Sequence, residues 1–157
     1  MKSLKLKLYQ NLCNYRKEGS FRYAETYPLP TPSMIRGMVH SLLKLNEYKP
    51  LLVSIQGESG GVITNLQKVY KFDRPREENP YVVIIGESRK TATHGIMFVD
   101  LHVHMNLILH IYFEDGNENL LSELLDRAQS EIVIVGRNED FALVEEAKIV
   151  ELKKVSN

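Results

Sequence analysis

The chain has 157 residues, of which 43% are hydrophobic and 25% are charged, and its formal net charge at pH 7 is zero. This length suits one hydrophobic core, so we predict a single domain spanning residues 1–157. No apolar run approaches the roughly 20 residues of a membrane helix. Lysines interrupt the first nine residues, which therefore do not resemble a secretory signal, and we expect a cytoplasmic protein. The single Cys13 lacks companions for a disulfide or a zinc site and is assigned no role.

The charges are unevenly spread along the chain. Residues 1–50 carry nine Lys and Arg against three Asp and Glu, whereas the remaining residues carry eleven against seventeen. The N-terminal third is therefore a candidate surface for an anionic ligand. A merely solvated surface would show the same imbalance, so charge alone does not choose between the two interpretations.

The first elements are a strand, a long loop and a helix. Leucines alternate with polar residues over 4–9, the period of a strand with one buried face. Residues 11–30 have no sustained periodicity and contain Gly and Pro among cations and aromatics, which predicts a loop. Thr31 is a favourable N-cap and Pro32 suits a first helical turn, so a helix begins here. Its four-residue spacing of basic side chains forms a stripe of Arg36, His40 and Lys44.

The middle of the chain is rich in strand patterns. Strands over 51–56 and 62–72 are separated by Gly60-Gly61, which predicts a hairpin. Residues 73–95 include a charged, proline-containing break and are predicted to be an inserted hairpin or flexible arm. From residue 97 to residue 113 the odd positions are apolar and the even face carries polar side chains, the clearest strand pattern in the sequence.

A second amphipathic helix is predicted over 117–128, followed by a strand over 131–135 and strand-like sequence over 141–152. The resulting order matches the split βαβ arrangement, an α+β, ferredoxin-like sandwich in which two helices cover one face of an antiparallel sheet. RNA-recognition domains use this arrangement, as do metal carriers, regulatory modules and small enzymes. The fold alone therefore does not decide the function.

Two segments together resemble the Cas-five family of CRISPR-associated RAMP proteins. They are YPLPTPSMIRGMVH at residues 27–40 and GRNEDFALVEEAKIVEL at residues 136–152. In that family the first motif leads from an N-terminal strand and arginine-containing loop into the first helix of a ferredoxin-like domain. A G-R-x-E-D-type turn lies near the C-terminal end. The resemblance implies a non-catalytic crRNA-binding subunit of a type I Cascade complex, which grips the 5′ handle of the guide RNA in antiviral defence.

The resemblance also implies partners. These are the guide crRNA, the repeated backbone subunit and the large subunit of Cascade, with target DNA contacted indirectly and no membrane partner. One branch of the family cleaves precursor crRNA, so a metal-independent endoribonuclease is the alternative function. A third hypothesis is a protein-interaction module whose basic face binds an acidic partner. We expect no cofactor.

The candidate RNA-binding residues are cations that neutralise phosphates and aromatic side chains that stack on unpaired bases. They cluster in the loop before the first helix and in the 73–95 insert, which in the family can form a thumb-like hairpin. Each of them could instead be an ordinary surface residue. The predicted RNA-binding set is Arg16, Lys17, Arg22, Tyr23, Tyr27, Arg36, Arg74, Arg76, Arg89, Lys90 and Arg137, with Tyr15 and Phe21 as further stacking candidates.

No catalytic residue is assigned in the main hypothesis. Metal-independent RNA cleavage needs a base for the 2′-hydroxyl, an acid for the departing 5′-oxygen and a cation for the charged intermediate. In the endoribonuclease alternative these roles fall to His94, Lys90 and Tyr27 or Tyr23, because the cleaving branch uses a similar set. A separate group of Asp100, His102 and His104 could offer metal ligands, but no fourth ligand is evident and no metal site is assigned.

Overall fold

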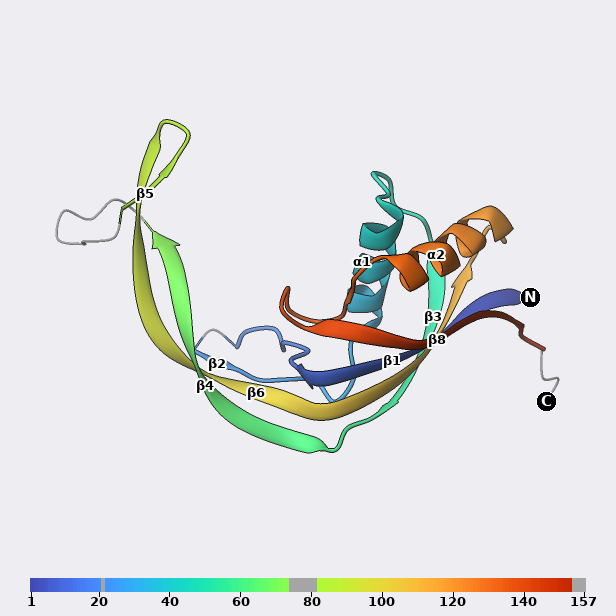
Figure 1. The fold of residues 1–157 in the computed structure, drawn as a ribbon, viewed down its shortest axis with the longest axis horizontal. Helices are drawn as coiled ribbons and strands as arrows, with labels where there is room; N and C mark the ends of the chain where they lie inside the picture. The colour runs from blue at the N-terminus through green and yellow to red at the C-terminus, as the bar shows by residue number, and fades with distance from the viewer. Residues whose placement is uncertain (21, 74–81, 154–157) are drawn as a thin grey trace.

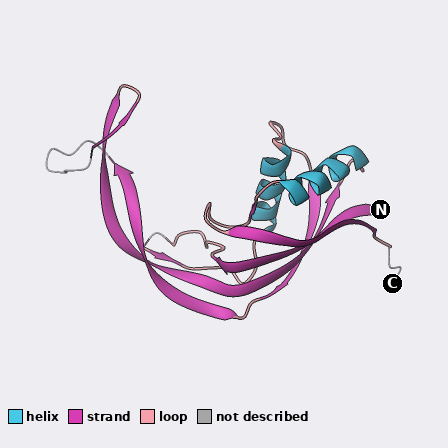
Figure 2. Ribbon diagram, viewed as in Figure 1, coloured by secondary structure: helices cyan, strands magenta, loops and turns pink. Residues whose placement is uncertain are grey.

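The computed structural model describes residues 1–20, 22–73 and 82–153, and these form an α+β protein with one open, mixed sheet and two helices (Figures 1 and 2). The described elements are β1 (Lys2–Cys13), β2 (Tyr23–Ala24), α1 (Pro32–Leu43), β3 (Leu51–Glu58), β4 (Gly61–Asp73), β5 (Val82–Ile85), β6 (Ser88–Phe113), α2 (Glu118–Ser130), β7 (Val133–Ile134) and β8 (Phe141–Glu151).

Strand β6 organises the sheet. It pairs antiparallel with β1, from Leu4 opposite Ile111 to Cys13 opposite His102. Its other edge pairs antiparallel with β3 and then with β4. Strand β8 pairs antiparallel with the far edge of β1, so the strand order is β8–β1–β6–β3. The short β2 pairs parallel with β6, which makes the sheet mixed.

The predicted hairpin at Gly60-Gly61 is wrong. Strands β3 and β4 run in the same direction along β6 and keep one register, with Glu58 opposite Asn106 and Gly61 opposite Val103. The backbone N–H of Gly60 still donates to the carbonyl of Val103 at 2.8 Å. His104 has a φ of 51°, so the interruption is a local irregularity of paired strands and not a reversal of the chain.

The turn that does reverse the chain lies inside the predicted insert. Ile85 pairs with Ser88 across a two-residue turn in which Gly86 has a φ of 60°, and this joins β5 to the start of β6. A hairpin, one of the two shapes expected for 73–95, is therefore present, although residues 74–81 lie outside the described part of the chain. We call β4, β5 and residues 88–103 of β6 the β4–β6 arm, which curves away from the rest of the sheet in Figure 1.

Both helices pack on one face of the sheet, as the sequence predicts (Figure 1). The Thr31 hydroxyl accepts a hydrogen bond from the Met34 N–H at 3.3 Å and Pro32 occupies the first turn. The Asn117 side chain caps α2 in the same way, at 3.1 Å from the Leu120 N–H. Among the described residues, no helix is long and apolar enough to cross a membrane. The main core joins the helices to the buried, odd-numbered positions of β6 that the sequence predicts: Met105, Leu107, Leu109, Ile111 and Phe113.

We expect Leu109→Ala to lower the free energy of unfolding by about 2–5 kcal/mol, because it leaves a cavity in a fully buried position. Ile108→Ala is the matched control, since its side chain belongs to the opposite, partly exposed face of the same strand. Urea denaturation followed by circular dichroism measures both. An equal or larger loss for Ile108→Ala would contradict this assignment of faces.

Candidate nucleic-acid groove

A groove of about 570 Å³ lies between the β4–β6 arm and the turn at residues 136–140, which carries the G-R-x-E-D motif. Apolar lining comes from Ala24 of β2, Val69 of β4, and Met97 and Val99 of β6. Three of these side chains belong to a small cluster with Leu101, separate from the main core. The polar and aromatic lining includes Asn14, Arg16, Gln67, Lys68, Tyr70, Arg137, Asn138 and Glu139.

A buried carboxylate builds the turn that borders this groove. Asp140 is 1% exposed, and its Oδ2 accepts the Asn14 N–H at 3.0 Å and the Arg137 N–H at 2.8 Å. Its Oδ1 accepts the Arg137 Nη2–H at 2.6 Å. Charge-assisted hydrogen bonds of this kind are among the strongest in proteins. Asp140 therefore ties the turn to the end of β1.

Gly136 allows the close approach that this tie requires. Its φ is 111°, a conformation that side chains rarely adopt. A Cβ atom there would lie 2.7 Å from the Asn14 carbonyl oxygen and 2.7 Å from Asp140 Oδ2. The glycine of the motif is thus explained by backbone conformation and contact with β1, so it need not touch RNA itself.

A second buried network lies behind the turn. Gln10 Nε2 donates to the carbonyls of Val135 and Asp140, both at 2.9 Å, and the Tyr15 hydroxyl donates to Gln10 Oε1 at 2.7 Å. Tyr15 is fully buried, and burial raises the pKa of its hydroxyl. The hypothesis that Tyr15 stacks on bases is therefore wrong. The sequence signal that was missed is the polar Gln10, which continues the buried alternating face of Leu6 and Leu8 in β1.

Arg137 lies at the mouth of the turn and reaches the arm. Its Nη1–H donates to Gln67 Oε1 of β4 at 2.9 Å, and Nη1 forms an ion pair with Glu139 at 3.0 Å. Burial alone would lower the pKa of Arg137, but the hydrogen bonds and charge of Asp140, with the charge of Glu139, outweigh it and raise this pKa. Its charge is thus balanced within the protein.

The other predicted residues of the 15–27 loop divide between several surroundings. Arg16 is exposed, lines the groove and donates from Nη2 to the Ser20 carbonyl at 2.6 Å. Lys17 forms an ion pair with Glu25 at 3.1 Å. Arg22 is exposed and does not line the groove. Tyr27 is half-buried against the main core. Phe21 lies outside the described residues.

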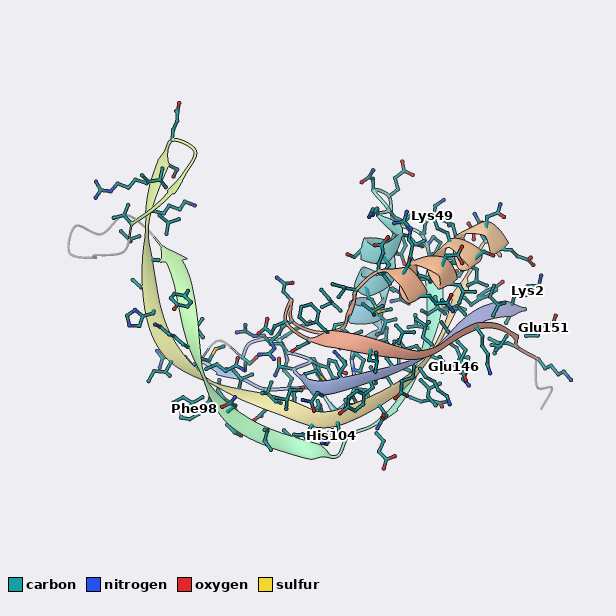
Figure 3. The ribbon with its side chains drawn as sticks, in the orientation of Figure 1. Lys2, Lys49, Phe98, His104, Glu146 and Glu151 are labelled. Carbon is teal, nitrogen blue, oxygen red and sulfur yellow. The ribbon has the colours of Figure 1, made fainter. Side chains whose placement is uncertain are left out.

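Tyr23 lies on the face of the arm opposite the groove. Its hydroxyl donates to Asp100, which also accepts from the Thr64 hydroxyl at 2.7 Å, and the hydrogen bond to Asp100 raises the pKa of Tyr23. Its ring meets Phe98 edge-on, with centroids 6.4 Å apart. Figure 3 shows Phe98 pointing outward from the curved sheet. Tyr23 and Arg16, which belong to the same segment before α1, thus lie on different surfaces.

The basic stripe of α1 is used to fasten the following loop. Arg36 Nε–H donates to the Leu51 carbonyl at 3.2 Å. His40 donates from Nδ1 to the Arg36 carbonyl at 2.8 Å and accepts the Lys49 N–H at Nε2, at 3.0 Å. Its ring stacks on Tyr48. None of the stripe residues lines the groove.

The residues of the endoribonuclease alternative do not converge. Lys90 and His94 lie on the arm, paired with Val83 and Tyr70. Tyr27 lies beside His102, because its carbonyl accepts a hydrogen bond from His102 Nε2 at 2.8 Å. His94 and His102 are eight residues apart on β6, so about 26 Å of strand separates His94 from the residue that contacts Tyr27. Arg89 is also exposed on the arm, whereas Arg74 and Arg76 lie outside the described residues.

The histidines of β6 are engaged with neighbouring polar groups. His102 is buried, and its Nδ1 lies 3.0 Å from the Ser59 hydroxyl. His104 is exposed, and its Nδ1 lies 2.6 Å from the Tyr9 hydroxyl. The left-handed conformation of His104 breaks the strand alternation from which we predicted a polar even-numbered face. Within the described ranges, no three side chains of metal-ligand type converge.

The model of one protein family, described as CRISPR-associated protein (Cas_Cas5), matches residues 3–156. The chain belongs to the Cas5 family. This confirms the family that the two sequence motifs indicate. No curated protein matches the chain.

Solved structures give further likenesses to this Cas5 chain. A chain of a CRISPR RNA-guided surveillance complex matches with a TM-score of 0.60 and 12% identity, covering 87% of the Cas5 chain. The Cas5 chain spans only 58% of that chain, and at this identity the likeness shows the fold alone. A functionally uncharacterized protein from Streptococcus mutans matches with a TM-score of 0.40 and 12% identity, with coverages of 93% and 66%. A chain of a type III-B Cmr-beta complex bound to cognate target RNA and AMPPnP matches with a TM-score of 0.41 and 15% identity. The match covers 99% of the Cas5 chain and 64% of that chain.

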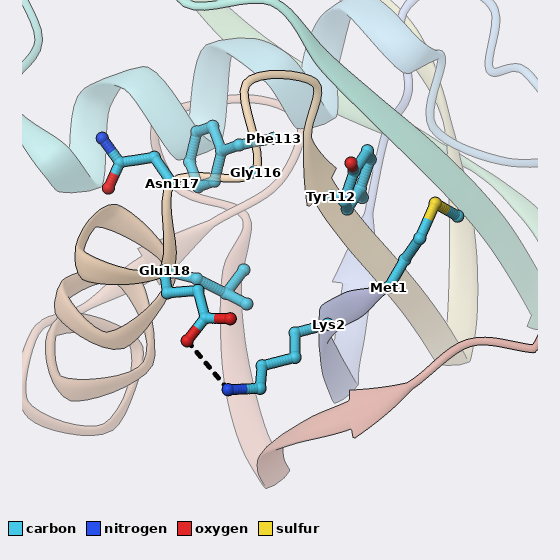
Figure 4. A pocket seen from close by; sticks show the side chains of 8 residues that line it. Met1, Lys2, Tyr112, Phe113, Gly116, Asn117 and Glu118 are labelled. Carbon is cyan, nitrogen blue, oxygen red and sulfur yellow. Dashed lines mark hydrogen bonds and ion pairs between the residues drawn. The ribbon is translucent and has the colours of Figure 1, made fainter.

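A smaller cavity of about 180 Å³ lies at the start of α2 in the Cas5 chain (Figure 4). Lys2 Nζ meets Glu118 Oε2 there at 2.8 Å, and the hydrogen bond and charge of Glu118 raise the pKa of Lys2. None of the predicted site residues lines this cavity. The larger groove is therefore the candidate functional site.

We expect Gly136→Ala to destabilise the protein by about 1–3 kcal/mol, because the added Cβ strains the backbone and meets Asn14 and Asp140. Gly37→Ala is the matched control, since Gly37 lies on the exposed side of α1 with nothing within 4 Å. That change should stabilise by about 0.5–1 kcal/mol. Thermal and urea unfolding measure both, and a neutral Gly136→Ala would contradict the assigned turn.

We expect the Cys13 thiol to resist modification in the folded protein. Burial raises its pKa to about 11, so almost no thiolate exists at pH 8. Labelling with a disulfide reagent at pH 8 should be slow in buffer and rapid in concentrated urea. Rapid labelling in buffer would show that the end of β1 is open to solvent.

Proposed function

We propose that this Cas5 chain is a non-catalytic, crRNA-binding subunit of a type I CRISPR Cascade complex that grips the 5′ handle of the guide RNA. It would act in antiviral defence in the cytoplasm. The observation that carries the proposal is the groove, where Arg16 and Arg137 border an apolar lining beside the G-R-x-E-D turn. The comparisons support membership of the family and likeness to a chain of a surveillance complex.

The chemistry of the groove suits an unpaired strand of RNA. Arg16 can neutralise phosphate, and it forms no ion pair with a described residue. Lys68 and Tyr70 alternate with Gln67 and Val69 along β4, so their side chains lie on the outer face of the arm with Ile96, where Lys68 Nζ lies 5.0 Å from the centre of the Tyr70 ring. Val69 and Met97 provide apolar surface for a base. A volume of about 570 Å³ also lies within the usual range of ligand pockets.

The fold supports the RAMP assignment. The order β8–β1–β6–β3, with antiparallel neighbours, is what a ferredoxin-like, RRM-like split βαβ domain requires if α1 and α2 are its two crossovers. We propose that residues 1–157 form one such domain and that the 73–95 insert extends the β4–β6 arm as a thumb. The predicted arm cations Arg74, Arg76, Arg89 and Lys90 would then meet the guide backbone.

Exposed apolar side chains support contacts with other subunits. Ile96 and Phe98 are 74% and 55% exposed on the outer face of the arm, and Leu143 is 63% exposed on β8. Ile96 and Phe98 share one face of β6, and exposed apolar side chains gathered on one face are typical of protein interfaces. We propose the repeated backbone subunit and the large subunit of Cascade as the partners, with target DNA contacted only through the assembly.

We do not propose the endoribonuclease alternative, because no observation favours it. The arm holds Lys90 and His94, while Tyr27 packs against the main core. The proposed chain therefore retains guide RNA and does not cut it.

The direct test is retention of labelled CRISPR repeat RNA in EDTA at several salt concentrations. We expect Arg16→Ala to weaken binding and to reduce the slope of log affinity against log salt by about one. Lys148→Ala is the control, because this exposed lysine lies on β8 outside the groove lining. Absence of binding by the unaltered protein at low salt, or equal effects of the two variants, would contradict the proposal.

A further inference from the structure

We propose that Arg137 shapes the groove as a positioning residue held by Asp140, and that phosphate is bound by its neighbour Arg16. This inference rests on the proposed function, and it revises the role that sequence similarity gives to Arg137. The arginine of the G-R-x-E-D turn then acts through Gln67 on the arm. Loss of Arg137 weakens RNA binding because it changes the shape of the groove.

The hydrogen-bonding capacity of the Arg137 guanidinium is used within the protein. A guanidinium has five N–H donors and cannot lose its charge in a protein. Nε lies 3.2 and 3.1 Å from the two Asp140 oxygens, and Nη2 lies 2.6 Å from Oδ1. Nη1 meets Gln67 Oε1 at 2.9 Å and Glu139 Oε1 at 3.0 Å. Every guanidinium nitrogen thus has a partner in the protein.

The positive charge of Arg137 is balanced by carboxylates of the protein. Two carboxylates, Asp140 and Glu139, surround the single charge of Arg137. Asp140 is buried and also accepts the Asn14 N–H, so it cannot turn away when an anion approaches. A phosphate at Arg137 would meet this fixed negative charge at short range. Arg16 presents no such obstacle among the described residues.

Arg137 lies between the turn at residues 136–140 and the β4–β6 arm. Asp140 fixes Arg137 to the end of β1, and Arg137 in turn binds Gln67, which belongs to β4. Arg137 and Gln67 both line the groove, so this hydrogen bond joins its two walls. The chain of contacts from Asn14 through Asp140 and Arg137 to Gln67 sets the distance between the turn and the arm. A flexible lysine cannot make the same forked contact.

Arg137→Lys separates the two roles because it keeps the charge and loses the fork. Positioning predicts that Arg137→Lys weakens binding of labelled repeat RNA by about tenfold, as strongly as Arg137→Ala, because partners of the guanidinium are left unsatisfied. The salt slope should stay that of the unaltered protein. If Arg137 bound phosphate, Arg137→Lys would bind nearly normally and Arg137→Ala would lower the slope by about one.

For Asp140→Asn, the positioning role and the phosphate-binding role of Arg137 predict opposite changes in RNA affinity. Positioning predicts weaker binding, since the carboxylate that orients Arg137 is lost. A phosphate role predicts tighter binding, since the arginine charge is released. Because Asp140→Asn could also unfold the turn, Gln67→Ala serves as a milder variant on the arm, and we expect it to weaken binding several-fold with an unchanged slope. Asn65→Ala is its control on the same strand outside the groove lining.

The outcomes distinguish this inference from the proposed function. If the unaltered protein does not retain repeat RNA, the proposed function fails. If it retains RNA while Arg137→Lys binds normally and Gln67→Ala has no effect, the proposed function stands and the positioning role of Arg137 is refuted. Thermal unfolding of each variant confirms that the RNA compared is bound by folded protein.

Discussion

The candidate site depends on one buried carboxylate. Asp140 joins the turn at residues 136–140 to the end of β1, and without it the Asn14 N–H, the Arg137 N–H and the guanidinium would lose a common acceptor. Burying a charge is costly unless it is paired and hydrogen-bonded, and here it is both. The chain therefore holds a C-terminal turn against an N-terminal strand, and the groove forms beside this junction.

The long strand β6 supplies the other wall. Its C-terminal half belongs to the main core under the two helices, while its N-terminal half continues into the arm. Because β3 and β4 keep one register along β6, the arm is a continuation of the sheet and not a separate unit. The left-handed His104, in the zone where β3 gives way to β4, marks the boundary between body and arm. A groove that uses both parts is thus built on one continuous strand.

The elements that depend on residues close together in the chain were predicted correctly from the sequence. The caps Thr31 and Asn117 and the alternation along β6 were sufficient to place both helices and the central strand. The hairpin at Gly60-Gly61 was wrong because pairing with β6 is a long-range contact, and a glycine pair fits an irregular strand as well as a turn. Tyr15 was misplaced because it lies in a segment without periodicity, and its burial depends on a contact with Gln10 on the buried face of β1. The groove itself joins segments from five parts of the chain, so it could not be predicted from any one motif.

We expect RNA to lie in the groove between the turn and the arm. Photocrosslinking of repeat RNA that carries 4-thiouridine, followed by mass spectrometry of the crosslinked peptides, tests this placement. RNA in the groove should give crosslinks in residues 14–16, 67–70 and 137–139, on both walls of the groove. Crosslinks confined to α1, α2 or the β8 surface would contradict it.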